Sequence, residues 1–281
     1  MTTISKIKGF NKSQINKVSG ISLSSIKKIN SVRLEPGFST HSIAFDGSSD
    51  YASVGSTGTG TELFPATVSD FTISFWIRFD SALTGFGYRG LFNRRNSNVD
   101  FIAFFYFMHN GTVFIQKKIN NVVKFSRSST GLLDLDPGEW YHIAIVNDVD
   151  GGTSGLKFYR NGSFFSSLGA LDNDDGTMED GNLNNKLEIG RFANGILYTV
   201  ASEIDDLAIH HAALSEDNIN AMWNNGEPID LTSDSGNYDQ SSDLAYYWKF
   251  ENNGTETVNN TTNSVTLFND ASYSSANPPG S

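Results

Sequence analysis

The residues with the clearest chemical potential lie in a short acidic segment, Glu203-Ile204-Asp205-Asp206-Leu207. Alternate side chains of a strand point to the same face, so Glu203 and Asp205 are expected side by side. Two carboxyl groups in this arrangement can perform general acid/base catalysis, as in glycoside hydrolysis. The same alternation predicts that Leu207 follows them on that face. Because this third residue is apolar, no acid/base pair is completed and the sequence favours binding over turnover.

Other residue types that support catalysis or metal binding are sparse. The chain has no cysteine, which excludes disulfides and thiolate metal sites. Its histidines show no metal-ligand spacing on a helix, and solvated or strand-end positions account for them. They are His41, His109, His142, His210 and His211. The sequence also contains no glycine-rich phosphate loop and no nucleophile elbow.

Most of residues 42–214 has the pattern of a β-sandwich. In Phe71–Phe79 the odd positions are large and apolar while most even positions are polar, and this period of two predicts one buried face. Asn161-Gly162 tolerates positive φ, so it predicts a hairpin turn after the strand-like run 156–160. Strands that recur about every ten residues, with turns between them, indicate a sandwich or jelly roll.

Six segments in a fixed order carry a resemblance to a known family. They are Ser42 to Tyr51, Phe71 to Phe79, Trp140 to Val146, Leu156 to Gly162, Leu187 to Gly190 and Ile204 to Ile209. In this order they resemble the laminin-G-like branch of the concanavalin A-like lectin/glucanase superfamily, over roughly residues 40 to 226. The resemblance implies an all-β fold, an antiparallel two-sheet jelly roll with one concave face. A fold of this kind does not determine function.

The resemblance also bears on the acidic residues. Related glucanases carry Glu-Ile-Asp-x-x-Glu on one strand, and the segment that starts at Glu203 begins in the same way and then fails. Similar sandwiches often tie a first-strand loop to the last strand through calcium, which would be held here by Asp46 and the Gly47 carbonyl with Asp205 or Asp206. Alternatively, Asp46 caps the Gly47 turn and the Asp pair accepts backbone hydrogen bonds. Calcium is therefore a structural option, and no cofactor is required.

An interaction surface is expected around the strand-like run Phe101–Met108, which is apolar on both sides. One side can face the core, and the other needs a loop, a subunit or a ligand. Aromatic rings suit the apolar faces of pyranoses, and arginine suits their hydroxyls. The residues expected at this carbohydrate or subunit contact are Trp76, Arg78, Phe105, Tyr106 and Tyr159.

Charge divides the chain into two parts. Residues 1–33 contain seven Lys or Arg and no acid, and the remainder has 13 basic against 31 acidic side chains, a net charge of −18. The basic arm repeats itself at a spacing of 11 residues. Its residues expected to dock on a scaffold are Ile4, Lys6, Ile7, Ile15, Lys17, Val18, Ile26, Lys28 and Ile29.

The repeat of the arm is expected to be extended or turn-rich. Eleven residues match three turns of a slightly underwound helix, but Gly9, Gly20 and many β-branched residues disfavour a helix. Three apolar stripes in so small a segment would stay exposed alone, which favours an arm ordered by a partner. A solvated, disordered tail is the alternative.

The segment after the sandwich is expected to return to it. Ser215 is a good N-cap for a short helix that Gly226 closes. Residues 244–251 and 269–273 resemble strands that precede the Phe-Asp-Gly segment in relatives, so their order here resembles a circular permutation. They are expected beside the Ile43 strand, or exchanged onto a neighbouring subunit. The expected parts are an anchoring arm (1–35), a jelly roll (36–226) and a C-terminal extension (227–281) that packs back on the sandwich.

Together these features favour a non-enzymatic structural protein of a virion. Repeats of the arm's Ile-x-Lys-Val-x-Gly type before such a domain are similar to arrangements in bacteriophage virion proteins. The protein would be made in the host cytoplasm, lack membrane insertion, attach to a virion scaffold through residues 1–33, form a homo-oligomer and display a domain that can meet a cell-surface glycan. Nucleic acid is disfavoured because the arm lacks interleaved aromatic residues. A bacterial carbohydrate-binding adhesin and a glycoside hydrolase are the alternatives.

Overall fold

The computed structural model describes most of the sandwich and short stretches of the arm. The described backbone comprises residues 39–54, 63, 70–81, 88–95, 101–108, 112–119, 122–129, 135–148, 156–170, 187–191, 201–258 and 263–278, together with six two-residue strands before residue 34. The side chains of those six strands and of residues 88–89, 94–95, 101–108, 117–119, 123–127 and 167–170 are not described.

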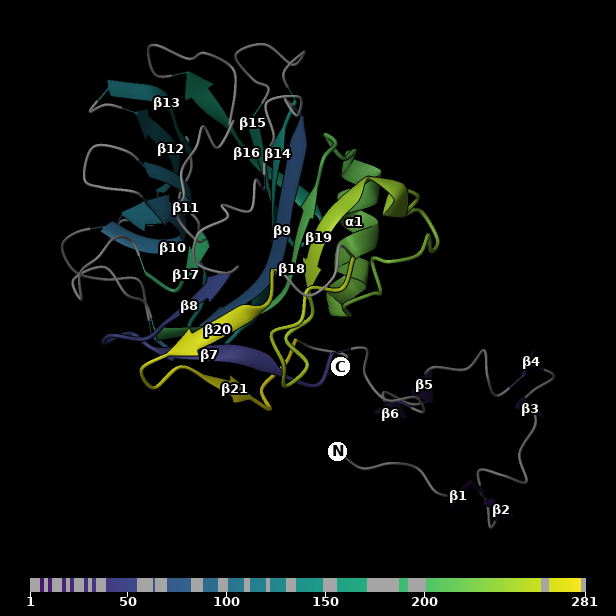
Figure 1. Cartoon of the computed structure of the whole chain (residues 1–281). Helices are drawn as coiled ribbons and strands as arrows, with labels where there is room; N and C mark the ends of the chain where they lie inside the picture. Colours follow the sequence, from purple (N-terminus) through teal and green to yellow (C-terminus); the bar gives the residue numbers. More distant parts are fainter. Residues whose placement is uncertain are drawn as a thin grey trace.

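Fifteen strands form one hydrogen-bonded sheet that bends at β16 into two layers, here called sheet I and sheet II (Figure 1). Sheet I has the order β16 (Ser163–Ala170), β15 (Leu156–Arg160), β14 (Trp140–Asn147), β9 (Phe71–Phe79), β18 (Ala201–His210), β7 (Ser42–Asp46) and β21 (Ser272–Ser274), and β19 (Leu244–Trp248) also pairs with β18. Sheet II has the order β20 (Val265–Phe268), β8 (Tyr51–Val54), β17 (Leu187–Ile189), β10 (Tyr88–Arg95), β11 (Phe101–Met108), β12 (Val113–Ile119), β13 (Val122–Ser129) and β16. All pairings are antiparallel, so the jelly-roll sandwich expected from the sequence is confirmed.

The main core lies between the two sheets and follows the period-two pattern of the strands. On β9 the side chains of Phe71, Phe75 and Ile77 are fully buried in it. Sheet II contributes residues such as Ile115 and Ile189 from the opposite side. Because fully burying one such side chain stabilises a fold by roughly 1.5–3 kcal/mol, this shared core is what holds the two sheets together.

The predicted hairpin at Asn161-Gly162 is confirmed. β15 and β16 pair across it, and the two turn residues have φ values of 50° and 74°. Gly162 is also constrained from outside, since a Cβ there would lie 2.8 Å from the side chain of Asn220.

A short helix, α1 (Glu216–Trp223), covers part of the other face of sheet I (Figure 1). Its Ile219 and Met222 join Ala144 and Tyr159 of the sheet in a second apolar cluster. The predicted N-cap is confirmed, because Ser215 accepts a hydrogen bond from the Asn218 backbone N–H. No helix in the described part of the chain is long and apolar enough to cross a membrane.

The end of α1 differs from the prediction that Gly226 closes the helix. The C-cap is Asn224, in the left-handed conformation, and its N–H binds the Asn220 carbonyl. A 3-10 turn, η5 (Asn224–Gly226), follows it. Asparagine is one of the few residues besides glycine that tolerate positive φ, so it can end a helix before the first glycine is reached.

Strand β18 shares its second edge between two partners. Its first half, residues 201–204, pairs with β7, and its second half, residues 207–210, pairs with β19. We call the junction between these partners the seam; it comprises the start of β7 with residues 39–41, the end of β19 with residues 249–251, and Asp205 and Asp206 of β18. The strand bulges at the seam, where its pairing with β9 shifts register and Asp206 has φ 48°.

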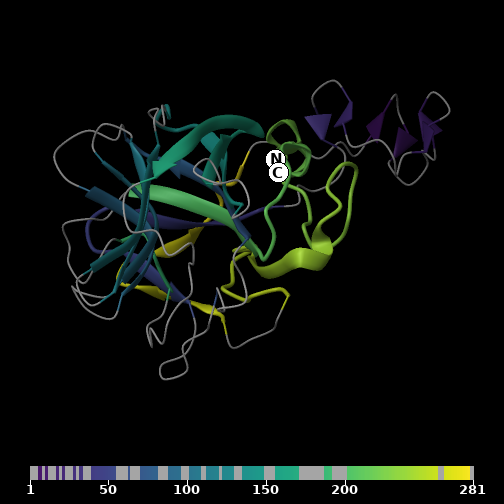
Figure 2. The same ribbon diagram turned by 90° about the horizontal axis from the view of Figure 1, so that it is seen from above.

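The C-terminal strands pair with both sheets. β19 and β21 extend sheet I beside β18 and β7, and β20 pairs with β8 at the edge of sheet II. A 3-10 turn, η6 (Ser241–Asp243), leads into β19. Figure 2 shows the yellow-green segment that contains β19 on one side of the sandwich. The boundaries of the three expected parts of the chain remain a prediction.

The described residues of the arm form three hairpins, each a separate two-stranded sheet. The paired strands are β1 (Lys6–Ile7) with β2 (Phe10–Asn11), β3 (Lys17–Val18) with β4 (Ile21–Ser22), and β5 (Lys28–Ile29) with β6 (Val32–Arg33). Equivalent strands begin 11 residues apart, the spacing of the sequence pattern.

Candidate functional site

Two carboxyl groups in the acidic segment of β18 are bound by neighbouring side chains. Glu203 is nearly buried, forms an ion pair with Arg78 and accepts a hydrogen bond from the Ser274 hydroxyl at 2.9 Å. Asp205 is fully buried and accepts a hydrogen bond from the Ser39 hydroxyl. Each carboxyl group therefore already has a protein partner.

The bulge corrects the prediction that Leu207 lies on the same face as Glu203 and Asp205. Ile204 and Leu207 both belong to the core between the sheets, although three positions separate them. The extra residue at Asp206 shifts the alternation, so Ala208 takes the outer position, in the cluster under α1. The position that completes the glucanase-like spacing is thus occupied by alanine.

The carboxyl groups of Asp205 and Asp206 are buried at the seam. Burial raises the pKa of Asp206 to about 8, while its hydrogen bond from the Tyr247 hydroxyl, at 2.7 Å, acts in the opposite direction. Burial, and then the charge of Asp206, raise the pKa of Asp205 well above its usual range. At neutral pH Asp206 is therefore mostly protonated.

The residues expected at a carbohydrate or subunit contact are divided between the two sheets. Trp76, Arg78 and Tyr159 lie on sheet I, whereas Phe105 and Tyr106 lie on β11 of sheet II, where side chains are not described. Trp76 and Tyr159 are 3% and 5% exposed, so neither ring offers a free face for stacking.

Sequence reasoning missed a better-placed aromatic residue, Trp140. It is partly exposed, lies opposite Arg78 in the β14–β9 register, and has the Arg78 guanidinium 5.9 Å from its ring centroid. The outer face of sheet I therefore has a polar row, Trp140, Arg78 and Glu203, on three adjacent strands.

The expectation that histidines occupy solvated or strand-end positions is wrong for His142. Its ring lies in the middle of β14, 2% exposed and 5.2 Å from the Trp76 ring. Burial lowers the pKa of His142 to about 3, and it lowers the pKa of His210 to a similar value. Both rings are neutral over the physiological range. His109 lies outside the described residues.

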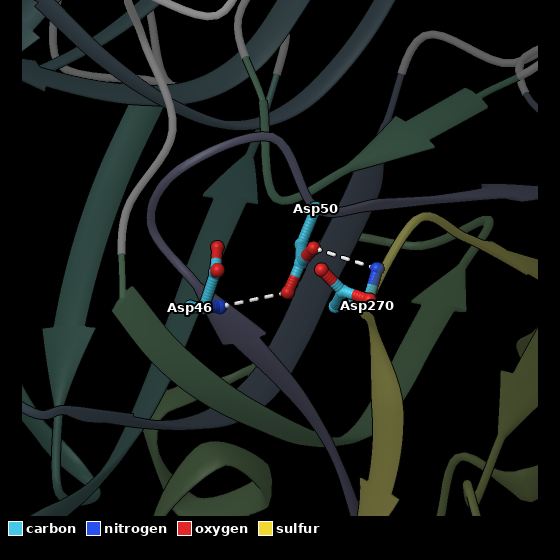
Figure 3. A group of neighbouring side chains, drawn as sticks. All are labelled: Asp46, Asp50 and Asp270. Atoms are coloured by element: carbon cyan, nitrogen blue, oxygen red, sulfur yellow. Dashed lines mark hydrogen bonds between the residues drawn. The ribbon is translucent and has the colours of Figure 1, made fainter.

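Three carboxylates converge at one end of the sandwich (Figure 3). Asp46 ends β7, Asp50 precedes β8 and Asp270 follows β20, and one oxygen of each lies within 4.8 Å of the others. Buried Asp50 accepts hydrogen bonds from the backbone N–H groups of Asp46, at 2.9 Å, and Asp270, at 3.0 Å. Asp50 thus ties the first strand of the sandwich to a loop 220 residues later.

The donor set of this acidic cluster fits a hard cation in part. Calcium takes six to eight oxygen ligands, and carboxylates are its preferred protein donors. Asp46 and Asp270 are exposed, while Asp50 has its two oxygens directed to backbone donors. The Asp46 carboxylate also accepts from the Ser48 N–H at 2.7 Å, which is the turn cap considered as the alternative to a metal site.

The set expected to bind calcium is not brought together as predicted. Asp46 pairs with Ala201, and Asp205 lies four positions further along β18, roughly 13 Å away by strand geometry. Asp46 and Gly47 are therefore grouped with Asp50 and Asp270, whereas Asp205 and Asp206 belong to the seam. Of the missed residues, Asp50 directly precedes β8, whereas Asp270 lies two positions after the end of β20. Neither position indicates from the sequence alone that the two carboxylates meet.

The residues expected to dock on a scaffold lie in or beside the hairpins of the arm. Lys6, Ile7, Lys17, Val18, Lys28 and Ile29 occupy β1, β3 and β5. Their side chains are not described, and Ile4, Ile15 and Ile26 lie outside the described residues.

Comparisons with solved structures find similar chains at low sequence identity. A heptameric SAP-like pentraxin from Limulus polyphemus is 16% identical, with 83% of this chain and 96% of that chain covered and a TM-score of 0.45. A protein from Bacteroides ovatus assigned as carbohydrate-binding is 17% identical, with 84% and 60% covered and a TM-score of 0.52. The receptor-binding domain of botulinum neurotoxin D is 20% identical, with 63% and 43% covered and a TM-score of 0.43. This chain thus spans less than two thirds of the Bacteroides ovatus protein and of the neurotoxin domain.

No curated protein matches the chain. The model of the Laminin_G_3 family, however, matches residues 46–220, which include β8 to β18 and most of α1. The match begins at the acidic cluster and ends beyond the bulged strand. The chain therefore belongs to the concanavalin A-like lectin/glucanases superfamily.

Proposed function

We propose that this protein is a non-enzymatic structural component of a virion that displays a lectin-like jelly roll outward, for adhesion to a surface glycan or for stabilisation of the particle. One observation carries the proposal: a basic segment of 33 residues without any acid precedes a body of net charge −18. Opposite charges on one chain suit a tether that binds an acidic scaffold and a body that it holds away from that scaffold.

The arrangement of the arm supports a docking role. Its three hairpins recur every 11 residues, so a scaffold with a matching repeat or symmetry would meet the same hairpin three times. Weak contacts made several times on one chain strengthen binding through their effective concentration. A homo-oligomer at a symmetric vertex or tail would multiply this effect, and the site of action would be the virion surface.

The test is deletion of residues 1–33 in an otherwise intact phage or expression system. Loss of the protein from purified particles, with an unchanged thermal unfolding midpoint of the truncated protein, is expected. Truncated protein that still enters particles would contradict the anchoring role. Full-length protein found on a bacterial surface without any particle would favour the carbohydrate-binding adhesin instead.

Absence of turnover is a separate part of the proposal. Glu203 is neutralised by Arg78, Asp205 is buried against Ser39, and Ala208 stands at the third position of the acidic motif. Wild-type protein and Glu203→Gln are expected to give the same background level of reducing sugar from bacterial polysaccharides. Hydrolysis by the wild type that Glu203→Gln abolishes would establish the glycoside hydrolase alternative.

A structural calcium ion also belongs to this proposal, with Asp46, Asp50 and Asp270 as its carboxylate ligands. An ion that binds only the folded state, at 100 times its Kd, would raise the free energy of unfolding by about 2.7 kcal/mol. Thermal unfolding of the wild type should then shift with calcium against chelator, and that of Asp270→Asn should not. Identical midpoints for the wild type in both buffers would remove the ion.

A further inference from the structure

Residues 39–41, which precede β7, are held against the body by two carboxyl groups from distant parts of the chain. The Ser39 hydroxyl donates a hydrogen bond to Asp205 of β18, 166 positions away, and Ser39 is fully buried. The Thr40 backbone N–H donates to the Glu251 carboxylate at 2.7 Å, and the Thr40 hydroxyl donates to the same group. We call residues 39–41 the strap, because they join β18 to the chain that follows β19.

Next to the strap, the carboxyl groups of Asp205 and Asp206 are both buried. Asp205 is fully buried, and Asp206 is 4% exposed. One oxygen of Asp206 accepts a hydrogen bond from the Tyr247 hydroxyl at 2.7 Å, and the other, Oδ2, has no hydrogen-bond partner among the described residues. Burial penalises the charged form of a carboxyl group, most of all where an oxygen has no donor. This arrangement favours a carboxyl pair that holds a proton.

The titratable groups that face this pair are mostly acidic. They are Tyr247, Lys249 and Glu251 from β19 and the chain after it, Asp230 from the segment before β19, and His41 of the strap. Glu251 and Asp230 oppose ionisation of Asp206, whereas Lys249 favours it but is itself paired with Asp230 at 3.0 Å. Burial raises the pKa of Tyr247 well above its usual range, so this hydroxyl stays protonated.

The neighbouring strands of sheet I add no net charge beside the pair. Trp76 of β9 lies opposite Asp205, and His142 lies opposite Trp76 on β14. The pKa of His142 is lowered by burial to about 3, so this ring is neutral. Two positions before Asp205, Glu203 forms its ion pair with Arg78.

We propose that the seam is a pH-operated latch, in which a proton on the Asp205–Asp206 pair keeps the strap closed and ionisation of both carboxyl groups releases it. Two adjacent buried charges repel each other and lack hydration, and detachment of the strap brings water to Asp205. The strap takes no part in the pairing of β18 with β7 and β19, so the opening is local and leaves sheet I paired. The latch is a property of the chain alone and depends neither on a virion nor on a glycan.

Closing of the latch is linked to proton uptake. Burial raises the pKa of Asp206 to about 8 and that of Asp205 well above its usual range, against a value of 3.8 for such groups in water. The closed state therefore holds protons that the open state has lost, so closing is most favourable below about pH 4 and weakens as pH rises to about 8. Each such proton changes the ratio of open to closed chains by up to about tenfold per pH unit.

The test is amide hydrogen exchange of the full-length protein, followed by NMR at pH 6, 7 and 8. The reporter is the Thr40 amide, which is bonded to Glu251, and the references are the core amides of β9, which exchange when the sandwich unfolds. After correction for the intrinsic exchange rate, the protection of Thr40 should be lower than that of β9 at each pH. It should also fall by about 10- to 100-fold from pH 6 to pH 8.

Three variants separate the latch from a static contact. Asp205→Asn keeps an oxygen for the Ser39 hydroxyl but cannot ionise, so its Thr40 protection should be nearly constant with pH. Asp206→Asn removes the neighbouring charge and should give a smaller fall than the wild type, which decides the matter even where Asp205→Asn does not fold. Asp80→Asn, at an exposed position, should match the wild type. The latch is overturned if Thr40 protection in the wild type is constant with pH or always equals that of β9, or if Asp206→Asn has the wild-type profile.

Discussion

The protonated carboxyl of Asp206 makes the stability of the sandwich depend on pH in an unusual direction. Its pKa is about 8 in the folded chain, against a model value of 3.8. Between these two values the folded state holds a proton that the unfolded state has lost, so stability falls as pH rises. The contribution is most favourable below pH 4 and is lost progressively up to about pH 8.

Asp206→Asn tests this reasoning with little change in structure. Asparagine keeps an acceptor oxygen for the Tyr247 hydroxyl and tolerates the φ of 48° at the bulge. Each unit of pKa shift corresponds to about 1.4 kcal/mol, and roughly three units separate the unfolded pKa from pH 7. The variant should therefore be more stable than the wild type by about 2–4 kcal/mol at pH 7. The upper value assumes that the whole pKa shift contributes to stability. The lower value allows for local rearrangement of the protein around an ionised Asp206. At pH 4 the two proteins should be equally stable.

The assay is urea unfolding of both proteins at half-unit steps from pH 4 to pH 9. Because the charge of Asp206 also raises the pKa of Asp205, the difference between the two proteins reports the titration of this carboxyl pair. Asp80→Asn removes an exposed carboxylate and should stay within about 0.5 kcal/mol of the wild type at each pH. A stability difference that is constant with pH, or an Asp206→Asn variant less stable than the wild type at pH 7, would mean that the Asp206 carboxylate is ionised in the folded protein. The raised pKa of Asp206 would then be refuted.

Three further predictions address other buried or constrained groups. Burial lowers the pKa of His142 to about 3, so the folded protein loses stability as pH falls from 6.5 toward 3. In urea unfolding, His142→Phe should reduce the stability lost between pH 7 and pH 4 by up to about 3 kcal/mol. An unchanged loss would mean that other groups cause the acid sensitivity. At Gly47, where φ is 78°, an added Cβ would lie 2.6 Å from the Ala201 nitrogen, so Gly47→Ala should lower the free energy of unfolding by about 2–3 kcal/mol. Gly138 has a similar φ of 84° but open space around it, so Gly138→Ala should lower it by only about 1 kcal/mol. Equal losses for the two variants would exclude the clash. Ser215→Ala removes the cap of α1 and should lower the free energy of unfolding by about 1 kcal/mol, whereas no change would show that the cap is replaced by water.

The features that local sequence predicts well are those with short-range causes. The alternation in Phe71–Phe79 and the turn at Asn161-Gly162 depend on neighbours within a few residues. The turn is found as expected. The odd positions of the strand face the core as expected, but Thr72, Ser74 and Trp76 on its other face are buried as well. Ser215 likewise caps a helix through an N–H only three positions away. Such features follow from backbone preferences and burial of one face, which act before any long-range contact is made.

The acidic residues show where this reasoning stops. Asp50 and Asp270 become neighbours only because β8 and β20 pair at the edge of sheet II, and 220 residues separate them. The bulge at Asp206, where φ is 48°, was not predicted either, because the alternation of the strand was assumed to continue through it. Alternation alone therefore misplaced Leu207, which faces the core.

The seam explains why the acidic motif of β18 became structural. One strand edge is shared by β7, which brings the chain in from the arm, and β19, which belongs to the C-terminal extension. Three carboxyl groups accept hydrogen bonds where the two partners meet. Asp205 accepts one from the Ser39 hydroxyl, and Asp206 accepts one from the Tyr247 hydroxyl. Glu251 accepts one from the Thr40 backbone N–H at 2.7 Å. These hydrogen bonds join residues 39 and 40 to β18 and to the chain that runs from β19 to Glu251, so the carboxyl groups have a structural role at the seam.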